Sequence, residues 1–260
     1  MNQKTPPINT LRFEVIPDIP LINRGDPLAQ IMLNAVTAGG VSLIDGDILV
    51  VAQKVVSKAE GRQVSLKDVT PSSEAHYLAA ETEKEPALCQ LILDESAEVL
   101  RKKPGVIIVR HRLGHVGANA GIDQSNIEHA DGDSALLLPI DPDRSAQEIR
   151  EQIRIATGCN LGVLISDSMN RPWRLGTVGS AIGCAGIQVL EDLRGGADMF
   201  GRELKVAMVN RADSLAAAAT LLMGETVERT PLVLVRGLPD VVDGETAADL
   251  IRPVEEDMFR

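Results

Sequence analysis

Short apolar runs rich in β-branched residues recur along the chain and alternate with longer stretches of mixed polarity. Each run is brief enough to form a strand, and together they cover residues 12–16, 48–56, 106–110, 134–138, 161–166, 187–190, 205–209 and 232–235. The stretches with helical character run from Pro27 to Ala38, Pro71 to Glu95, Ser145 to Thr157 and Ala212 to Met223. Asp26 and Asp143 are the N-caps expected for the first and third of these helices. Because strands and helices alternate imperfectly, the pattern predicts mixed α and β layers.

The segment from Leu138 to Asp143 is the best candidate for a junction within the chain. Its two prolines, Pro139 and Pro142, disfavour both a helix and a central strand. This composition fits a linker between two closely associated subdomains, and it fits equally a loop within one domain. The pattern alone leaves both arrangements open.

Composition limits how the core is built and where the protein resides. Of the 260 residues, 44 % are hydrophobic but only 2 % are aromatic, so the core must consist of Val, Ile, Leu, Ala and Met side chains. No apolar run approaches the roughly 18 to 20 residues that a transmembrane helix needs. The N-terminal segment MNQKTPPINT is polar and does not resemble a signal peptide. We therefore expect a cytoplasmic protein without membrane association.

The charge balance argues against one class of partner. The formal net charge is −11 and aromatic residues are scarce, whereas nonspecific nucleic-acid surfaces combine basic stripes with aromatic stacking platforms. A small polyanion can still bind to such an acidic protein if Arg, Lys or a divalent cation neutralises it locally. We therefore expect no nucleic-acid partner.

The familiar motifs for nucleotide and metal binding are missing from the sequence. Neither GxxxxGK[ST] nor GxGxxG occurs, so any nucleotide site must be of another kind. The four histidines do not follow HExxH spacing and are expected to be structural or surface residues: His76, His111, His115 and His129. The three cysteines lack CxxC spacing and are expected to be small buried hydrophobic residues: Cys89, Cys159 and Cys184.

The segment NAGIDQSN at residues 119–126 follows a predicted strand and is rich in small and oxygen-bearing side chains. Asp123 can supply a hard carboxylate oxygen to Mg²⁺ or Mn²⁺, and Asn126 can donate an amide hydrogen bond to a phosphate or a base. An Asx turn that satisfies its own backbone is the alternative explanation.

A second carboxylate, Asp167, comes directly after the predicted buried strand at residues 161–166 and is followed by Ser168. In α/β architectures, ligands gather at the carboxyl ends of strands. Arg171 and Arg174 follow within seven residues, and guanidinium groups suit forked recognition of carboxylates or phosphates. The alternative is that Asp167 simply caps a helix.

Glycines at 176, 179, 183 and 186 recur every three or four residues. Such spacing lets a helix or a loop approach another backbone closely, and tight packing is its ordinary explanation.

Glu225 ends a long apolar helix, where a carboxylate is unfavourable against the helix dipole. A bound cation would relieve this misplacement. Asp123, Asp167 and Glu225 thus offer oxygen ligands from distant segments, as a two-metal or Mg-nucleotide site requires. The sequence alone does not show that they converge.

Taken together, the quoted segments resemble the coenzyme F420-0:L-glutamate ligase family. The resemblance covers about residues 12 to 238 and rests on segments whose order and spacing also match: residues 16–22, 50–61, NAGIDQSN at 119–126, SDS at 166–168, RPWR at 171–174, FGREL at 200–204 and LLMGE at 221–225. It implies an α+β fold of mixed sheets with packed helices and two intimately associated subdomains. Residues 1–260 would form a single ligase-like domain, with a subdomain junction near 138–143 and no added reductase domain.

The same resemblance implies a homodimeric enzyme of coenzyme F420 biosynthesis. This ligase would use GTP and Mg²⁺ or Mn²⁺, with K⁺ as a further candidate cofactor, to join L-glutamate to coenzyme F420-0 by a γ-glutamyl amide link. The γ-phosphoryl group of GTP would first activate a carboxylate as an acyl phosphate. Two alternatives remain: an amide ligase of the same fold with a different acidic acceptor, and a noncatalytic nucleotide-binding regulator.

The resemblance also assigns site residues. The residues expected to line the GTP site are Ile19, Pro20, Leu21, Ile22, Gln53, Lys58 and Asn126. The expected metal ligands are Asp123, Asp167, Ser168 and Glu225, the last in a segment that closes over metal and nucleotide. The residues expected to position anions during catalysis are Lys58, Arg171 and Arg174. Ser168 stands where the family often has Thr, which keeps the hydroxyl group, whereas the run around 168–174 departs further and puts the acceptor in question.

Overall fold

The centre of the molecule is a mixed five-stranded sheet with strand order β1-β12-β2-β8-β9. The computed structural model describes residues 10–129, 132–170, 173–238 and 242–258. The strands of this sheet are β1 (Arg12–Val15), β2 (Ile48–Ala52), β8 (Gly162–Asn170), β9 (Thr177–Ala185) and β12 (Leu232–Arg236). Strands β2 and β8 are parallel, and the other neighbours are antiparallel.

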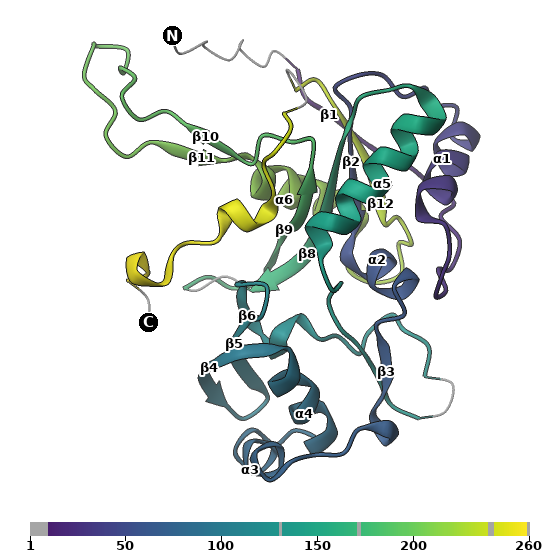
Figure 1. Cartoon of the computed structure of the whole chain (residues 1–260), viewed down its shortest axis with the longest axis vertical. Helices are drawn as coiled ribbons and strands as arrows, with labels where there is room; N and C mark the ends of the chain where they lie inside the picture. The colour runs from purple at the N-terminus through teal and green to yellow at the C-terminus, as the bar shows by residue number, and fades with distance from the viewer. Residues whose placement is uncertain (1–9, 130–131, 171–172, 239–241, 259–260) are drawn as a thin grey trace.

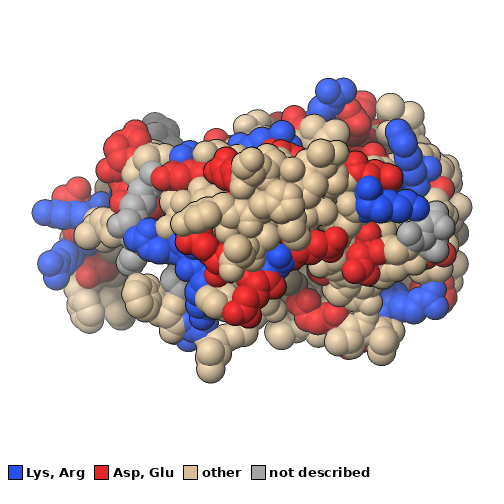
Figure 2. Space-filling model, turned by 90° about the horizontal axis from the view of Figure 1, so that it is seen from below, with Lys and Arg blue, Asp and Glu red and all other residues tan. Residues whose placement is uncertain are grey.

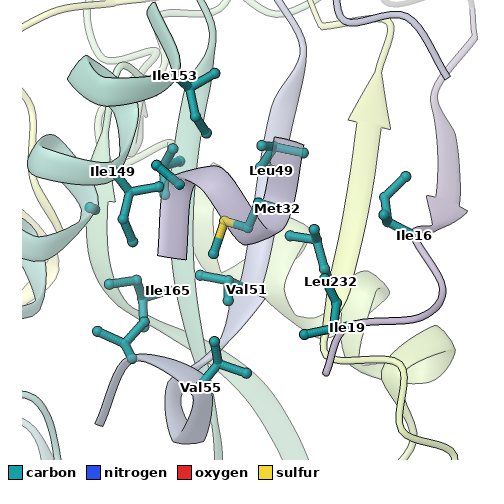
Figure 3. Close-up of a cluster of buried hydrophobic side chains, with 14 of the residues drawn as sticks. Ile16, Ile19, Met32, Leu49, Val51, Val55, Ile149, Ile153, Ile165 and Leu232 are labelled. Atoms are coloured by element: carbon teal, nitrogen blue, oxygen red, sulfur yellow. The ribbon is translucent and has the colours of Figure 1, made fainter. Parts of the chain in front are cut away.

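Helices cover both faces of this sheet (Figure 1). Helices α1 (Leu28–Ala38) and α5 (Pro142–Thr157) lie on one face, and α6 (Arg211–Met223) lies on the other. Strand β2 shows the consequence, because Leu49 and Val51 pack towards α1 and α5 while Ile48 and Val50 pack towards α6. The first of these clusters is drawn in Figure 3. Burial on both faces explains why β2 is apolar at every position instead of alternating.

A smaller lobe lies below the central sheet in Figure 1. It consists of α3 (Ser73–Thr82), α4 (Pro86–Glu95) and a three-stranded sheet made of β4 (Ser96–Lys103), β5 (Val106–His111) and β6 (Val116–Ala118). The lobe has a hydrophobic cluster of its own, which includes Leu78, Ile92 and Ile107. Helix α2 (Gln53–Ala59) and the strand pair β3 (Gln63–Ser65) and β7 (Ser134–Leu136) connect it with the central sheet. The fold is α+β with mixed sheets and packed helices, as predicted.

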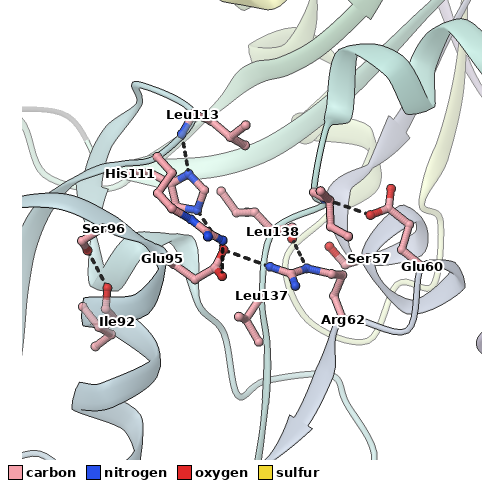
Figure 4. A network of polar contacts seen from close by, with 12 residues as sticks. Ser57, Glu60, Arg62, Ile92, Glu95, Ser96, His111, Leu113, Leu137 and Leu138 are labelled. Carbon is pink, nitrogen blue, oxygen red and sulfur yellow. Dashed lines mark hydrogen bonds and ion pairs between the residues drawn. The ribbon is translucent and has the colours of Figure 1, made fainter. Parts of the chain in front are cut away.

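A buried polar network lies where the smaller lobe meets the segment after α2 (Figure 4). Glu95 is only 5 % exposed, and its carboxylate pairs with Arg62 at 2.9 Å and with Arg112 at 2.5 Å. His111 places its Nε2 3.3 Å from the same carboxylate. Arg62 also donates its Nε–H to the carbonyl oxygen of Leu138 at 2.8 Å. The network therefore joins four separate segments.

The two strands β10 (Leu190–Asp192) and β11 (Met208–Asn210) pair at the base of a long arm that extends away from the sheet (Figure 1).

Charged side chains are dispersed over the surface: in Figure 2 acidic and basic residues are interspersed with uncharged ones over the face shown. None of the helices in the described part of the chain has the length and apolar character that crossing a bilayer requires.

One predicted strand and one predicted helix are each divided in the structure. The strand predicted at 48–56 ends at Ala52, and helix α2 begins at Gln53. The helix predicted from Pro71 to Glu95 is two helices, because Glu83 adopts the left-handed conformation with φ +56° and ends α3. Pro86 then occupies the first turn of α4, where the absence of an N–H group costs nothing.

Both predicted N-caps are wrong. The carboxylate of Asp26 accepts the backbone N–H of Asn23, and helix α1 has no side-chain cap. Helix α5 begins earlier than predicted, and Asp141 caps it by accepting the backbone N–H of Arg144. Asp143 instead accepts backbone N–H groups of Cys184, Ala247 and Ala248, which ties the C-terminal segment to the sheet.

The strands predicted at 187–190 and 205–209 are shorter in the structure and shifted towards the C-terminus, as β10 and β11. Four strands of the described residues were not predicted: β3, β4, β6 and β9. The recurring glycines belong to β9 and its ends, not to a helix or a free loop. Their packing role is confirmed at Gly179, Gly183 and Gly186, but not at Gly176, where a methyl group would meet nothing within 4 Å. A methyl group at Gly179 would lie 2.4 Å from the carbonyl oxygen of Ala216, so α6 can approach β9 only because this position lacks a side chain.

Candidate functional site

A cleft of about 880 Å³ opens at the edge of the central sheet where β2 and β8 end. Its walls come from the loop after β1, helix α2, the segment around residues 123–128, the end of β8 and the loop after α6. Eleven of the residues expected at a site line this one cleft: Ile19, Pro20, Leu21, Ile22, Gln53, Lys58, Asp123, Asn126, Asp167, Ser168 and Glu225. The tertiary structure therefore brings together segments that are far apart in the sequence.

Parallel pairing of β2 with β8 creates this edge. Ala52 is the partner of Ser166 in the register, so the two strands end their shared ladder side by side. Helix α2 starts immediately after β2, whereas β8 continues beyond it, paired with β9 through Asp167 and Ser168. Asp167 therefore lies within a strand, and the alternative that it caps a helix is wrong.

Asp123 is fixed by its own backbone and by a lysine. Its backbone makes both hydrogen bonds of a β-bridge with Leu136. One carboxylate oxygen, Oδ1, accepts the backbone N–H of Ser125 at 2.7 Å, and Oδ2 lies 2.6 Å from Nζ of Lys54. The Asx turn considered as an alternative is thus present, and the carboxylate faces the cleft as well. Burial raises the pKa of Asp123, but the hydrogen bonds from Lys54 and Ser125 outweigh it and lower the pKa overall.

Asp167 has the opposite electrostatic environment. Burial raises its pKa to about 7, and the nearby charges of Asp123 and Glu225 act in the same direction, against the Ser168 amide and Lys54. Next to it, the hydroxyl group of Ser168 donates to Oε1 of Glu225 at 2.5 Å. A carboxylate in these surroundings is destabilised when ionised, and a bound cation would relieve the repulsion.

The donor set suits a hard divalent cation bound with a phosphate ligand. Among the described residues, no three His, Cys, Asp or Glu side chains lie close enough to hold an ion by themselves. Mg²⁺ is usually held by one or two carboxylates, with water and substrate phosphates completing the octahedron. The oxygens of Asp123, Asp167, Ser168 and Glu225 fit that pattern better than an all-protein cage.

Two lysines on one face of α2 supply positive charge to the cleft. Lys54 and Lys58 are four residues apart, which places them on the same side of the helix. Lys58 donates to the carbonyl oxygen of Asn126 at 2.7 Å, and burial together with the charge of Lys54 lowers its pKa. Sequence reasoning missed the role of Lys54, although it adjoins Gln53 in a segment that carries the family resemblance.

Other predicted residues have different positions. Arg171 lies outside the described residues. Arg174 is exposed near the tip of the β8–β9 hairpin and does not line the cleft, so its position gives no support to a role in positioning anions. Gln53 lines the cleft, but its amide is buried and donates to the Ser57 hydroxyl at 2.5 Å. The loop at 226–231, which was not among the residues predicted from the sequence, also lines the cleft.

Comparisons with known proteins agree with this picture. The profile of the F420-0:Gamma-glutamyl ligase family matches residues 17–237. A protein of Methanothermobacter thermautotrophicus named coenzyme F420:L-glutamate ligase is 45 % identical over 247 residues, which cover 93 % of this chain and 96 % of the relative.

Two further proteins with the same name show similar coverage. The protein of Methanopyrus kandleri is 44 % identical over 255 residues, covering 96 % of this chain and 98 % of the relative. That of Archaeoglobus fulgidus is 42 % identical over 252 residues, covering 96 % and 97 %. By the family profile and by these full-length similarities, the chain belongs to the F420-0:γ-glutamyl ligase family.

Proposed function

We propose that this protein joins L-glutamate to coenzyme F420-0 by an amide bond, with GTP as the energy source and Mg²⁺ or Mn²⁺ as the cofactor. The observation that carries the proposal is a single cleft in which Asp123, Asp167 and Glu225 lie together with Lys54 and Lys58. Oxygen donors for a cation and ammonium groups for anions are what a ligase needs to bring two or three anionic substrates together.

We assign two groups of cleft residues to different ligands. Lys58 and Asn126, whose carbonyl oxygen accepts from Lys58, are assigned to the nucleotide. Asp167 and Ser168, on the part of β8 that pairs with β9, are assigned to the cation together with Glu225 on the loop after α6. The cation would neutralise charge on the phosphate oxygens during transfer. Lys58, whose ammonium group is pre-positioned by Asn126, would orient the phosphate chain.

The proposed chemistry follows from the weakness of a carboxylate as an acyl donor. A carboxylate oxygen of the acceptor attacks the γ-phosphorus of GTP, and the bond to the β–γ bridging oxygen breaks to release GDP. The amine of L-glutamate then attacks the carbonyl carbon of the acyl phosphate, loses a proton and expels inorganic phosphate. The cleft would contribute by holding the reactants close to one another.

The test is the mass of the product. Purified protein is incubated with coenzyme F420-0, L-glutamate, Mn²⁺ and GTP, and we expect the acceptor to gain one or more glutamyl residues with release of phosphate. Reactions that lack GTP or Mn²⁺ serve as controls and should show no gain. With hydroxylamine in place of glutamate, a hydroxamate of the acceptor should form. GTP binding without any mass gain would contradict the proposal and would favour another acidic acceptor or a regulatory role.

We also propose that the protein is a homodimer and that the arm between β10 and β11 belongs to the interface. Met199, Phe200 and Val206 are 89 %, 87 % and 87 % exposed, which is unusual for large apolar side chains on a segment that extends from the body. A second copy of the chain would cover them. We expect wild type to have the molar mass of a dimer in multi-angle light scattering, and Phe200→Asp together with Val206→Asp to shift it towards the monomer. Tyr77→Asp, at an exposed apolar position of the smaller lobe, is the control, and a wild-type monomer would refute the assignment.

A further inference from the structure

Lys54 occupies an unusual position among the acidic groups of the cleft. Its ammonium group lies 2.6 Å from Oδ2 of Asp123, 3.0 Å from the hydroxyl oxygen of Ser125 and 3.3 Å from the Ser125 carbonyl oxygen. Its side chain is only 27 % exposed. Three oxygens surround one cationic group, as they would surround a metal ion with hard ligands.

Both carboxylate oxygens of Asp123 are engaged in this arrangement. Oδ1 accepts the backbone N–H of Ser125, a bond that belongs to the local turn and holds the side chain in place. The turn therefore leaves Oδ2 as the oxygen that can change partner, and Lys54 is that partner. A divalent cation bound through Oδ2 and the Lys54 ammonium group cannot take the same place, because the two positive charges repel each other at contact distance.

The Lys54 ammonium group can also take a second position within the cleft. It starts the face of α2 on which Lys58 follows one turn later, and both lysines line the same cleft as the proposed nucleotide site. A flexible four-carbon stem lets an ammonium group swing by several ångströms without moving the helix. Once released from Asp123, Lys54 would lie in a cleft with an anion to bind.

We propose that Lys54 is an exchangeable counter-ion of Asp123: the divalent cation displaces it from the carboxylate, and the released ammonium group then binds an oxyanion of the co-substrate. This inference rests on the proposed function, because it assumes that cation and nucleotide share the cleft. It makes the two ligands interdependent. Each ligand favours the arrangement in which Lys54 has left Asp123, so each raises the affinity for the other by the same factor.

The proposal makes a counter-intuitive prediction about Lys54→Met. Without nucleotide, this variant should bind Mn²⁺ more tightly than wild type, by about 10-fold, since the competing ammonium group is gone. With Mn²⁺ present, the same variant should bind GTP more weakly than wild type. The measurements are free Mn²⁺ by electron paramagnetic resonance and GTP binding by calorimetry, and neither depends on turnover.

Lys58→Met is the matched control. It removes the same charge from the same face of α2, but Lys58 contacts the Asn126 carbonyl oxygen and not a carboxylate. Its Mn²⁺ affinity should change by less than about threefold, which measures the general effect of losing a positive charge in the cleft. Lys54→Arg keeps the charge and should keep wild-type Mn²⁺ binding. In a background of Asp123→Asn, Lys54→Met should no longer improve Mn²⁺ binding, because the contested oxygen is absent.

The possible results separate this inference from the proposed function. Unchanged or weaker Mn²⁺ binding by Lys54→Met overturns the counter-ion role, even if the wild-type protein ligates glutamate with GTP and Mn²⁺. Equal gains in Lys54→Met and Lys58→Met also overturn it, because they reduce the effect to bulk charge. If no variant binds Mn²⁺, both the counter-ion role and the assigned cation site fail. Circular dichroism melting curves check that each variant is folded.

Discussion

Asp167→Asn is expected to lower the rate of glutamate ligation by at least about 100-fold while leaving the protein folded. The substitution keeps the shape of the side chain but removes the charge at the end of β8 that we assign to cation binding. Losing one electrostatic contact to charge that develops in a transition state typically costs on the order of 10² to 10³ in rate. The measurement is the initial rate of GTP-dependent mass gain of coenzyme F420-0, together with the melting temperature.

The stability of this variant provides a second, independent readout. Burial and the charges of Asp123 and Glu225 raise the pKa of Asp167 to about 7, so ionising this group is unfavourable in the folded protein. Removing the carboxylate should therefore leave the melting temperature unchanged or raise it. Greater stability with lost activity is the signature of a residue kept for function. The matched control is Asp192→Asn on β10, outside the cleft, which should retain the wild-type rate. An Asp167→Asn enzyme with near-normal activity would remove Asp167 from the proposed site.

The largest effect on stability is expected for Glu95→Ala. This substitution leaves the guanidinium groups of Arg62 and Arg112 without their shared carboxylate, and the Glu95 side chain is only 6 % exposed. Breaking a buried ion pair by removing one partner costs roughly 3–5 kcal/mol, and here the charge left poorly solvated is that of Arg62, whose side chain is 18 % exposed, whereas Arg112 is 56 % exposed and stays hydrated. We expect a loss of that size in the free energy of unfolding, measured by urea titration.

The pH dependence of stability tests the same network with Glu95→Gln, which removes the charge but leaves no cavity as Glu95→Ala does. Burial alone raises the pKa of Glu95, but His111, Arg62 and Arg112 together lower it from 4.5 to about 2. A carboxylate whose pKa is lower in the folded state than in the unfolded state stabilises the protein when the pH is above the unfolded-state pKa. This contribution is lost as the pH falls from about 4.5 towards 2. The difference in unfolding free energy between wild type and Glu95→Gln should therefore be largest near pH 6 and shrink as the pH approaches 2.

An exposed ion pair provides the comparison for Glu95. Glu148 and Arg144 pair at 2.8 Å on the surface of α5, where both side chains are more than half exposed. Glu148→Gln should leave the free energy of unfolding close to the wild-type value at every pH, since solvent screens the pair. If Glu95→Gln behaved like Glu148→Gln, the network in Figure 4 would contribute no more than a surface contact.

Helix α2 illustrates where the sequence signal was ambiguous. The segment Val50 to Val56 contains four β-branched valines, which indicates a strand, yet Gln53 and Lys54 interrupt it and Gln53 starts a helix. A run of this length has no reliable periodicity, and the choice depends on what each side chain contacts. Here Val51 packs within the sheet, while Val55 and Val56 reach the same hydrophobic cluster from a helix that crosses the sheet edge.

Strand β9 was not predicted because its sequence carries no strand signal. Its glycines lower strand propensity, so no local signal predicts it. In the structure Gly179 and Gly183 are the positions at which α6 and the start of α5 come within contact of the strand. The need for glycine at these positions is set by the neighbouring helices, so only the tertiary structure reveals it.

What the sequence determined by itself is local. Apolar runs, polar turns and oxygen-bearing segments can be read from neighbouring residues, and they were sufficient to predict mixed α and β layers with Asp123, Asp167 and Glu225 as candidate ligands. Family resemblance then supplied the α+β fold class and the expected roles. The tertiary structure decided which groups meet: Lys54 with Asp123, Ser168 with Glu225, and Glu95 with Arg62. Such contacts join residues 33 to 69 positions apart, and their free energies depend on burial and distance in the folded chain, which no local pattern encodes.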